Sequence, residues 1–540
     1  MCRNKIHFII ILLLFLFNMY AQKDLITNVA NRNIKSLNGK WNIIIDPYNN
    51  GFYDYRMEEN SNGFFKNQKP SNKSDLVEYD FDKSETLIVP GDWNSQKPEL
   101  LYYEGSIWYK TSFNYKLPAG KRLFLWFGAI NYKADVYLNG TKIGHHEGGF
   151  TPFYFDITSL IKEKDNFLIV RVNNERKPEY VPTINTDWWN YGGITRDVLL
   201  IEEDSLFVLD YFIFLNKNDK NNISGWIKLN KPLKEKEITI KIPELKILYK
   251  SKTDSSGIAY ISIKSKDIIL WSPTNPKLYS VEINFQNTNL KDKIGFKNIE
   301  IKGKDIIING EKVFLKGICI HEELPMRRGR ANGIEDAKTL LGWAKELGCN
   351  YVRLAHYPHN EWMTRMADSM GLFVWSEIPV YWTIQFKNPN VYTLSERMLE
   401  DNINRDKNRV SILVWSIGNE TPVYEERTEF MRKLARKAKE LDPTRFVSAA
   451  LEISRDNENP FIYNINDPLG EYLDIISCNE YVGWYDGLTE KTEKITWKCK
   501  YDKPFLFSEL GAGALQGYHG DSLTRWTEEY QEYFYTQQIK

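Results

Sequence analysis

The chain has 540 residues, with 71 Lys and Arg against 71 Asp and Glu, and its side chains are 42% hydrophobic and 14% aromatic. Because the charges cancel, no basic excess is available to bind a phosphate backbone, and a dedicated nucleic-acid binder is not expected. The length predicts three or four domains. The 16 Trp, 32 Tyr and 28 Phe supply flat apolar platforms that suit the apolar faces of sugar rings.

The first 21 residues are typical of a secretory signal peptide. Basic residues between Arg3 and Lys5 precede an apolar run over residues 6–17, and the small residue Ala21 marks the expected cleavage point. The apolar run is too short to span a bilayer comfortably, so a membrane anchor is the weaker alternative. We therefore expect a secreted or periplasmic protein that has no membrane contact once the signal is removed.

Four cysteines remain after the signal, and none is in a CxxC pair: Cys319, Cys349, Cys478 and Cys499. Three of them stand at strand positions among apolar or small residues, which favours buried structural thiols. A metal site or a disulfide framework is the minor alternative. We expect neither a metal ion nor an organic cofactor.

Short strands separated by turns predict two antiparallel β-sandwich domains, over residues 22–203 and 204–302. In the first domain the expected strands are residues 41–45, 107–113, 122–127, 134–138 and 166–172. The second domain has the length of an immunoglobulin-like sandwich, with expected strands at residues 225–229, 237–242, 258–263 and 278–285. Its Lys- and Asn-rich stretch, residues 216–222, is expected to be an exposed turn.

After Asp305, short apolar runs alternate with helical patterns, which is the rhythm of βα repeats. Expected helices include one with Ala337, Leu340, Leu341, Ala344 and Leu347 on one face, and others around residues 394–409 and 430–441. We expect seven strands, at residues 313–320, 350–354, 372–375, 412–415, 446–450, 475–478 and 505–507.

This pattern predicts a (β/α)8 TIM barrel over residues 303–540, whose chemistry lies on the loops after the carboxyl ends of the strands. The sequence stops at Lys540, inside the helix expected after the seventh strand. We therefore expect a barrel that is C-terminally incomplete, truncated before strand eight.

Several acids lie just past an expected strand, but position alone does not separate a catalyst from a loop cap or an ion-pair member. These acids are Glu322, Glu323, Glu377, Glu420, Glu480 and Glu509. Glu420 ends the segment VWSIGNE after strand four, and Glu509 ends FLFSE after strand seven. Strands four and seven face each other across the mouth of a closed barrel, so these two carboxyls can flank one bond of a substrate. Cleavage of a glycosidic bond needs such a pair.

With these motifs, the chain resembles the family 2 glycoside hydrolases, the group that holds β-galactosidases, β-glucuronidases and β-mannosidases. The resemblance runs from Leu37 to the end and implies that the first sandwich is a jelly-roll, sugar-binding-like domain. Its markers, in chain order, are VPGDW at 89–93, EGGFTPF at 147–153, DWWNYGGITRD at 187–197, LWSP at 270–273, KGICIHE at 316–322, HYP at 356–358, NE at 419–420 and SE at 508–509.

The resemblance implies a retaining exo-β-glycosidase in which Glu420 is the general acid/base and Glu509 is the nucleophile. It also implies that Asn419 hydrogen-bonds the 2-hydroxyl of the sugar, a contact that strengthens in the transition state. Tyr481 resembles a tyrosine that hydrogen-bonds the nucleophile and keeps it ionised.

Four further residues resemble positions that bind the terminal sugar. Asp187 is expected to reach from the first sandwich into the pocket, and His356 to contact sugar hydroxyls. For Trp484 and Tyr485, core packing and sugar contact are equal alternatives, and Tyr485 resembles a sugar-binding tyrosine of β-glucuronidases. If Asp187 closes the pocket, the enzyme acts from chain ends.

The segments around residues 148–153, 190–196 and 481–485 look most like β-glucuronidases, so a β-glucuronide is the predicted substrate. A β-galactosidase is the alternative, because the Asn-x-Lys pair with which bacterial β-glucuronidases bind the glucuronate carboxylate does not follow Glu509. The alternative from another functional class is a carbohydrate-binding protein without catalysis. The carboxylate pair argues against it, because such a protein does not need one. A transglycosylase would use the same residues. The expected partner is a carbohydrate, and a homo-oligomer remains an open alternative.

Overall fold

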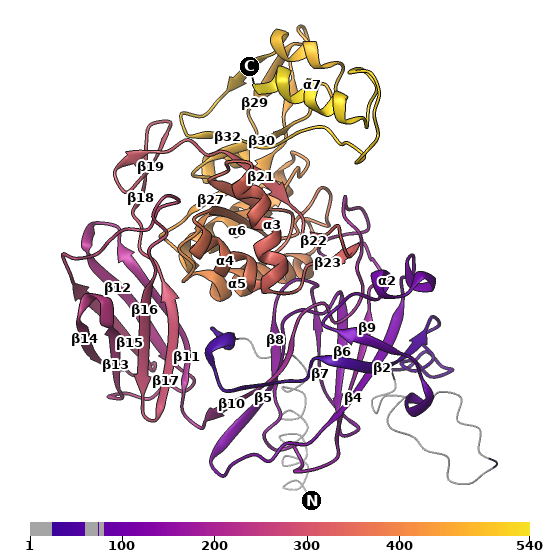
Figure 1. Ribbon diagram of the computed structural model, residues 1–540, viewed down its shortest axis with the longest axis vertical. Coiled ribbons are helices and arrows are strands. Elements are labelled where there is room, and N and C mark those ends of the chain that lie inside the picture. The colour runs from indigo at the N-terminus through magenta and orange to yellow at the C-terminus, as the bar shows by residue number, and fades with distance from the viewer. Residues whose placement is uncertain (1–23, 60–73, 75–79, 540) are drawn as a thin grey trace, which may run out of the picture.

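The computed structural model describes residues 24–59, 74 and 80–539, so the predicted signal peptide lies outside the described residues. Figure 1 shows a central barrel with the two β-sandwiches on one side of it and helix α7 (Glu528–Ile539) on the other. No helix in the part of the chain that is described is long and apolar enough to cross a membrane.

The first sandwich consists of two antiparallel sheets that bury a shared apolar core, which includes Trp41, Tyr109 and Phe127. One sheet has the order β3 (Thr86–Val89), β2 (Gly39–Asp46), β4 (Ser106–Phe113), β9 (Asn166–Asn173), β6 (Lys133–Leu138) and β7 (Thr141–Glu147). The other has the order β1 (Ile34–Ser36), β10 (Val198–Asp204), β5 (Lys121–Phe127) and β8 (Phe153–Asp156), and the short helix α2 (Trp93–Gln96) follows β3. All five strands predicted in this domain are confirmed.

The second sandwich pairs a three-stranded and a four-stranded antiparallel sheet. Its sheets have the orders β11 (Val208–Asn216), β12 (Asp219–Leu229), β15 (Ile258–Lys264), and β14 (Ile247–Lys252), β13 (Glu237–Ile242), β16 (Tyr279–Phe285), β17 (Thr288–Ile294). Along β16 every second residue is buried, because alternate side chains face the core. The exposed turn predicted over residues 216–222 is confirmed only at Lys217 and Asn218, which join β11 to β12. Residues 219–222 instead begin strand β12, and Asn222 is buried.

The barrel is a sheet of seven parallel strands, and all seven predicted strands are confirmed. Their order is β21 (Gly317–Ile320), β24 (Tyr351–Leu354), β25 (Phe373–Glu377), β26 (Ile412–Asn419), β27 (Phe446–Leu451), β30 (Ile476–Glu480) and β32 (Phe505–Leu510). The first and last strands approach each other where the Cys319 thiol donates to the Ser508 carbonyl, at 3.2 Å. Parallel strands bring all seven carboxyl ends to one side of the barrel.

Four α-helices connect the first five strands: α3 (Ile334–Glu346), α4 (Glu361–Met370), α5 (Pro389–Asp406) and α6 (Glu425–Leu441). The remaining short strands are β18 (Ile299–Lys302), β19 (Asp305–Ile308), β20 (Glu311–Lys312), β22 (Glu323–Leu324), β23 (Gly329–Arg330), β28 (Ser454–Arg455), β29 (Ile462–Ile465) and β31 (Thr496–Cys499). Helix α7 packs on the loop after β30, where Tyr530 and Phe534 contact Trp484.

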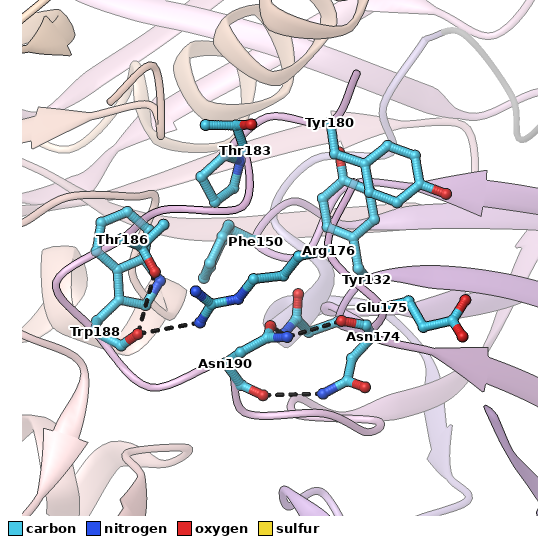
Figure 2. Close-up of a pocket in the computed structure, with 12 residues that line it drawn as sticks. Tyr132, Phe150, Asn174, Glu175, Arg176, Tyr180, Thr183, Thr186, Trp188 and Asn190 are labelled. Atoms are coloured by element: carbon cyan, nitrogen blue, oxygen red, sulfur yellow. Dashed lines mark hydrogen bonds between the residues drawn. The ribbon is translucent and has the colours of Figure 1, made fainter. Parts of the chain in front are cut away.

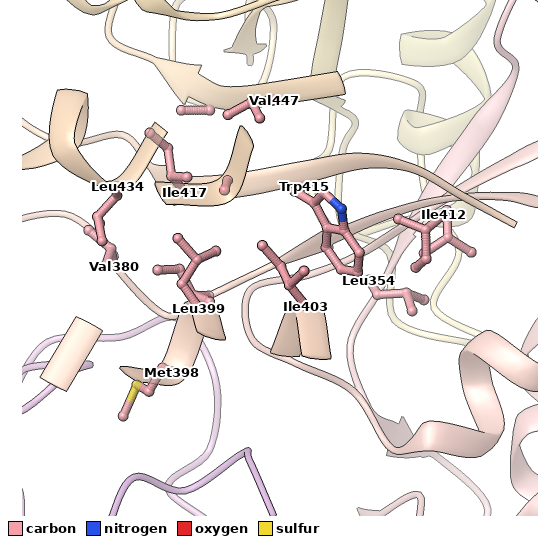
Figure 3. Close-up of a cluster of buried hydrophobic side chains, with 14 of the residues drawn as sticks. Leu354, Val380, Met398, Leu399, Ile403, Ile412, Trp415, Ile417, Leu434 and Val447 are labelled. Carbon is pink, nitrogen blue, oxygen red and sulfur yellow. The ribbon is translucent and has the colours of Figure 1, made fainter. Parts of the chain in front are cut away.

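The core between strands and helices fixes the strand that carries the predicted acid. Figure 3 shows Leu399 and Ile403, one turn apart on α5, directed toward Trp415 and Ile417 of β26. The buried Trp415 indole also donates to Asp442, at 2.9 Å. Together these contacts hold β26 in place up to Asn419.

Two predictions about burial are wrong. Leu347 lies beyond the end of α3 and is exposed, because the helix ends at Glu346 before another turn can bring it to the core. Of the four cysteines expected to be structural thiols, only Cys478 is buried; Cys349 is partly exposed, and Cys319 and Cys499 are exposed free thiols. Cys319 lies on β21 and Cys499 lies on β31, and both strands are at sheet edges. Cys478 lies on the interior strand β30.

A buried ion cluster joins the first sandwich to the barrel. The Glu322 carboxylate lies 3.0 Å from Nη2 of Arg196, which belongs to the sandwich, and 2.9 Å from Nη2 of Arg330. Burial raises the pKa of Glu322, but the two guanidinium groups lower it more, and the net pKa is below its usual range. Glu322 is therefore a charged group inside the domain interface.

We expect Glu322→Gln to lower the free energy of unfolding by about 3–5 kcal/mol, because two buried guanidinium groups lose their shared counter-charge. Urea unfolding of purified proteins measures the change. The control is Glu237→Gln, which removes an exposed partner of Lys250 and is expected to change stability by less than about 1 kcal/mol. Equal losses in both variants would contradict this account of the interface.

Candidate active site

A single buried guanidinium, that of Arg353 on β24, lies at the centre of the residues that gather at the carboxyl ends of the strands. Its Nη1 donates to Glu509, at 2.5 Å. Its Nη2 donates to Glu377 at 3.0 Å and to the side-chain oxygen of Asn419 at 2.8 Å. Arg353 therefore connects the ends of β25, β26 and β32, and it brings both predicted catalytic segments into one hydrogen-bond network.

Glu509 accepts hydrogen bonds from a cation and from a phenol. The Tyr481 hydroxyl donates to Oε2 of Glu509 at 2.6 Å, and Nη1 of Arg353 donates to Oε1. Burial and the nearby Glu509 charge raise the pKa of Tyr481, so this phenol stays protonated and keeps its donor. Both oxygens of the Glu509 carboxylate therefore accept a hydrogen bond, and the contact predicted between Tyr481 and Glu509 is present.

Glu420 has a different environment, with neutral donors only. Asn479 donates to Oε1 at 2.8 Å, and the Trp382 indole donates to Oε2 at 2.9 Å. The backbone at Glu420 is left-handed, with φ of 47°. Such a conformation is uncommon for a residue other than glycine and is concentrated at functional sites.

Asn419 presents a donor that the protein does not use. Its oxygen accepts from Arg353 and from Asn479, and its Nδ2 has no hydrogen-bond partner within the described residues. The two accepted bonds fix the orientation of the amide. The amide nitrogen is therefore a buried donor that the described residues leave unpaired.

His356 is held by the carboxylate at the end of β25. Its Nδ1 lies 3.0 Å from Glu377, and its Nε2 lies 3.4 Å from Glu509. Burial raises the pKa of Glu377, but Arg353, His356 and the Trp375 indole lower it more, to about 2. Glu377 is thus a permanent anion that orients His356 and balances Arg353.

Asp187 reaches the barrel mouth on a loop of the first sandwich. The Tyr381 hydroxyl donates to its Oδ2 at 3.0 Å. The next residue, Trp188, is buried against His356 and Tyr381, with ring centroids 5.8 and 5.0 Å away. The sandwich therefore contributes a carboxylate to the site.

Figure 2 shows the other side of this loop, where Arg176 donates to the Trp188 carbonyl and Asn190 donates to the Asn174 carbonyl. The cavity there measures about 20 Å³. That is room for one or two water molecules, not for a sugar. The residues that line this cavity therefore support the loop that carries Asp187.

The two remaining predicted residues lie on the loop after β30. Trp484 is only 6% exposed and packs against Trp526 and Tyr530, which supports the packing alternative for Trp484. Tyr485 is 75% exposed, and its ring lies 5.1 Å from that of Tyr481. Sugar contact by Tyr485 stays a prediction.

Five members of the network had no role predicted from the sequence. Arg353 had a detectable signal, because it is a charged residue inside an apolar strand, and Glu377 appeared among the strand-end acids without a role. Tyr381, Trp382 and Asn479 had no comparable signal. Tyr381 and Trp382 meet Asn419 because the segment after β25 runs parallel to the end of β26, where the Trp382 amide donates to the Asn419 carbonyl at 3.0 Å.

Two models of known protein families match this chain, one over the first sandwich and one over the barrel. The family model described as "Glycosyl hydrolases family 2, sugar binding domain" matches residues 34–204, and "Glycosyl hydrolases family 2, TIM barrel domain" matches residues 299–540. The chain belongs to glycosyl hydrolase family 2. The resemblance of the sequence motifs is thereby confirmed, and the protein is a glycoside hydrolase.

Several similar proteins are described as β-glucuronidases. A β-glucuronidase of Paenibacillus borealis is 28% identical, over 95% of this chain and 88% of the relative. A solved β-glucuronidase of an uncultured Clostridium has a TM-score of 0.78 at 26% identity, covering 96% of this chain and 90% of its own. The β-glucuronidase of Ruminococcus gnavus in complex with D-glucaro-d-lactam has a TM-score of 0.77 at 26% identity, with the same coverage.

Another strand-end acid of this glycoside hydrolase, Glu480, lies outside the Arg353 network. The Val482 amide donates to its Oε1 at 2.6 Å, and its Oε2 has no partner within the described residues. Burial raises its pKa to about 7. Since the unfolded chain ionises this group near its usual pKa of about 4.3, the free energy of unfolding falls as pH rises from there to above 7.

We expect Glu480→Gln to stabilise the protein at pH 8, by at most about 3 kcal/mol, and to have little effect at pH 5, where Glu480 is itself neutral. Thermal unfolding at the two pH values measures the difference. The exposed Glu458→Gln serves as control. A stabilisation independent of pH would show that charge burial is not the cause.

Proposed function

We propose that this family 2 enzyme is an exo-acting β-glucuronidase that works by double displacement with retention of configuration. The observation that carries the proposal is the asymmetry between two carboxylates in one network. Glu509 is paired with the Arg353 guanidinium, whereas Glu420 receives only neutral donors. The solved β-glucuronidases at 26% identity and the curated relative support the choice of sugar.

In the first step, Glu509 attacks the anomeric carbon and Glu420 donates its proton to the leaving oxygen. Arg353 and Tyr481 hydrogen-bond the two oxygens of Glu509 and hold its carboxylate in position for this attack. When the glycosyl–Glu509 bond forms, the carboxylate loses its charge. Arg353 then still has the Glu377 carboxylate as a partner, so no buried cation is left alone.

In the second step, Glu420 takes a proton from water, which attacks the anomeric carbon and releases Glu509. Glu420 can change its charge between the steps because its partners, Asn479 and Trp382, are neutral. Neither protonation state breaks an ion pair. An acid that alternates between donor and acceptor requires this freedom.

The terminal sugar is positioned by groups from both domains. The free amide of Asn419 donates to the 2-hydroxyl, and His356 and Asp187 contact other hydroxyls. Because Asp187 and Trp188 come from the sandwich, their loop bounds the pocket at the end of the sugar chain. This geometry favours attack on chain ends.

We expect Glu509→Gln and Glu420→Gln to lower kcat by about 10³-fold or more on an unactivated β-glycoside. The two should differ on an aryl glycoside with an activated leaving group, since formation of the glycosyl-enzyme then needs the nucleophile but not the acid. Only Glu420→Gln should give a burst of phenol release. Glu323→Gln, a strand-end acid outside the network, serves as control. Full activity of Glu420→Gln on the unactivated substrate would contradict its role.

The sugar is tested on the purified protein with four matched nitrophenyl substrates: β-glucuronide, β-galacturonide, β-glucoside and β-galactoside. We expect the glucuronide to have the highest kcat/KM, at least about tenfold above the glucoside, because a pocket built for a carboxylate leaves polar groups unpaired when that group is missing. A preference for the galactoside would overturn the assignment in favour of a β-galactosidase.

We also propose that the enzyme is exported to the periplasm or the medium. The basic residues, apolar run and Ala21 within residues 1–21 support this location. N-terminal sequencing of the protein from cell fractions tests it, with a mature chain that begins at Gln22 expected outside the cytosol. An uncleaved cytosolic chain would contradict it.

A further inference from the structure

A carboxylate that the double displacement does not use lies beside the acid/base. Glu452 is the first residue after β27, and β27 is the neighbour of β26 in the barrel sheet. Asn419 stands in register with Ala450, and the Glu420 amide donates to the Ala450 carbonyl at 2.9 Å. Glu452 therefore follows, by two residues, the point at which β27 contacts the acid/base.

The alternation of side chains along β27 directs Glu452 toward the interior of the barrel mouth. Val447 and Leu451 belong to the apolar cluster that packs on helix α6, and Figure 3 shows Val447 in that cluster. The opposite face of β27 carries Ser448 and Ala450, and the Ser448 hydroxyl lies 3.2 Å from a hydroxyl of β30. Because successive side chains of a strand point to opposite faces, Glu452 continues the series of Ser448 and Ala450.

Glu452 is a half-buried carboxylate that accepts no hydrogen bond from the part of the chain that is described. Burial and then the nearby charge of Glu420 raise its pKa, and Arg427 lowers it less. Arg427 is not its ion-pair partner, because this guanidinium bonds both oxygens of Asp467, at 3.0 and 2.6 Å, and the Thr421 carbonyl. The oxygens of Glu452 are therefore acceptors within reach of the Glu420 charge.

The loop that carries Glu452 is bonded to the neighbouring loop of the mouth. Its strand β28 pairs with β29, and Arg455 forms an ion pair with Asp486 at 2.8 Å. Asp486 follows Tyr485 on the loop after β30 and also accepts from Lys491 at 2.6 Å. Glu452 is thus part of a connected rim that runs from the acid/base to the loop after β30.

Trp382 supplies a flat apolar surface at the same acid/base. Its Nε1 donates to Oε2 of Glu420 at 2.9 Å, its ring lies 4.6 Å from that of Tyr381, and its side chain stays partly exposed. A leaving oxygen that takes its proton from Glu420 brings its own group next to Trp382 and Glu452. An indole suits the apolar face of a pyranose ring, and a carboxylate accepts from its hydroxyls.

We propose that Glu452 is a specificity-determining residue that selects a neutral sugar unit as the leaving group. Its carboxylate accepts hydrogen bonds from hydroxyls of this unit, while Trp382 covers the apolar face of the ring. A leaving unit with a negative charge is repelled by Glu452, and an apolar aglycone would cover the carboxylate without offering it a donor. The role rests on the proposed function of Glu420 as acid/base, and it names the group on the other side of the cleaved bond.

The first experiment measures binding in the inactive Glu509→Gln protein, so that no turnover is needed. Calorimetry compares disaccharides in which β-glucuronic acid is 1,3- or 1,4-linked to glucose with methyl β-glucuronide, which lacks the second ring. We expect added Glu452→Leu to raise the Kd of the better disaccharide, relative to that of the methyl glycoside, about tenfold or more, because hydrogen bonds to a charged group are lost. The matched control is Glu458→Leu, the same change at an exposed acid of the same loop, which should leave the ratio unchanged.

The second experiment uses the active protein and expects a gain. Hydrolysis of the same disaccharide is compared with that of its analogue whose glucose carries a 6-sulfate. We expect Glu452→Gln to raise kcat/KM for the sulfated substrate, relative to the neutral one, about threefold or more, because the repelling charge is removed and the shape is kept. A variant that is merely damaged would lower both values without raising their ratio.

The outcomes separate this role from the choice of sugar. The glycone of every probe is the sugar preferred among the four nitrophenyl substrates, so a different preference changes the probes and leaves the comparison intact. Failure of all four substrates would refute the proposed function and the role of Glu452 with it. With an active protein, the role is overturned if the disaccharide binds no more tightly than the methyl glycoside, or if either ratio is unchanged in its Glu452 variant.

Discussion

The buried guanidinium of Arg353 is the interaction on which the site depends. It has no exposure to solvent, and such a cation is tolerated only where acids and hydrogen-bond acceptors surround it. Glu377 and Glu509 supply the acids, and Asn419 supplies an amide oxygen. Each acceptor lies at the end of a different strand. The ion pairs and hydrogen bonds of this one side chain therefore hold the ends of several strands together.

The pairing of Arg353 also gives the two carboxylates different chemical environments. Glu509 takes part in the charge balance of Arg353, while Glu420 is excluded from it by Asn479 and Trp382. Glu377 completes the balance, because it keeps Arg353 paired when Glu509 is neutralised. A single ion triad therefore holds Glu509 beside a cation and leaves Glu420 outside any ion pair.

The pocket is a product of two domains, and the interfaces between domains are charged. Glu322 joins Arg196 of the sandwich to Arg330 of the barrel, and this places the loop that carries Asp187 and Trp188 over the strand ends. On the other flank, Arg409 pairs with Asp292 of the immunoglobulin-like domain at 2.5 Å.

The sequence alone determined the strands, because alternation in the sandwiches and apolar runs in the barrel reflect local burial that each segment imposes by itself. It also determined Glu420 and Glu509, since each ends an apolar strand in a recognisable motif. The tertiary structure decided which polar groups meet them. Trp382, which follows β25, and Asn479, on β30, donate hydrogen bonds to Glu420. The exposure of Cys319 depends on β21 being at the sheet edge. Such contacts join residues far apart in the chain, and no local pattern encodes them, because they arise only when parallel strands bring their carboxyl ends together.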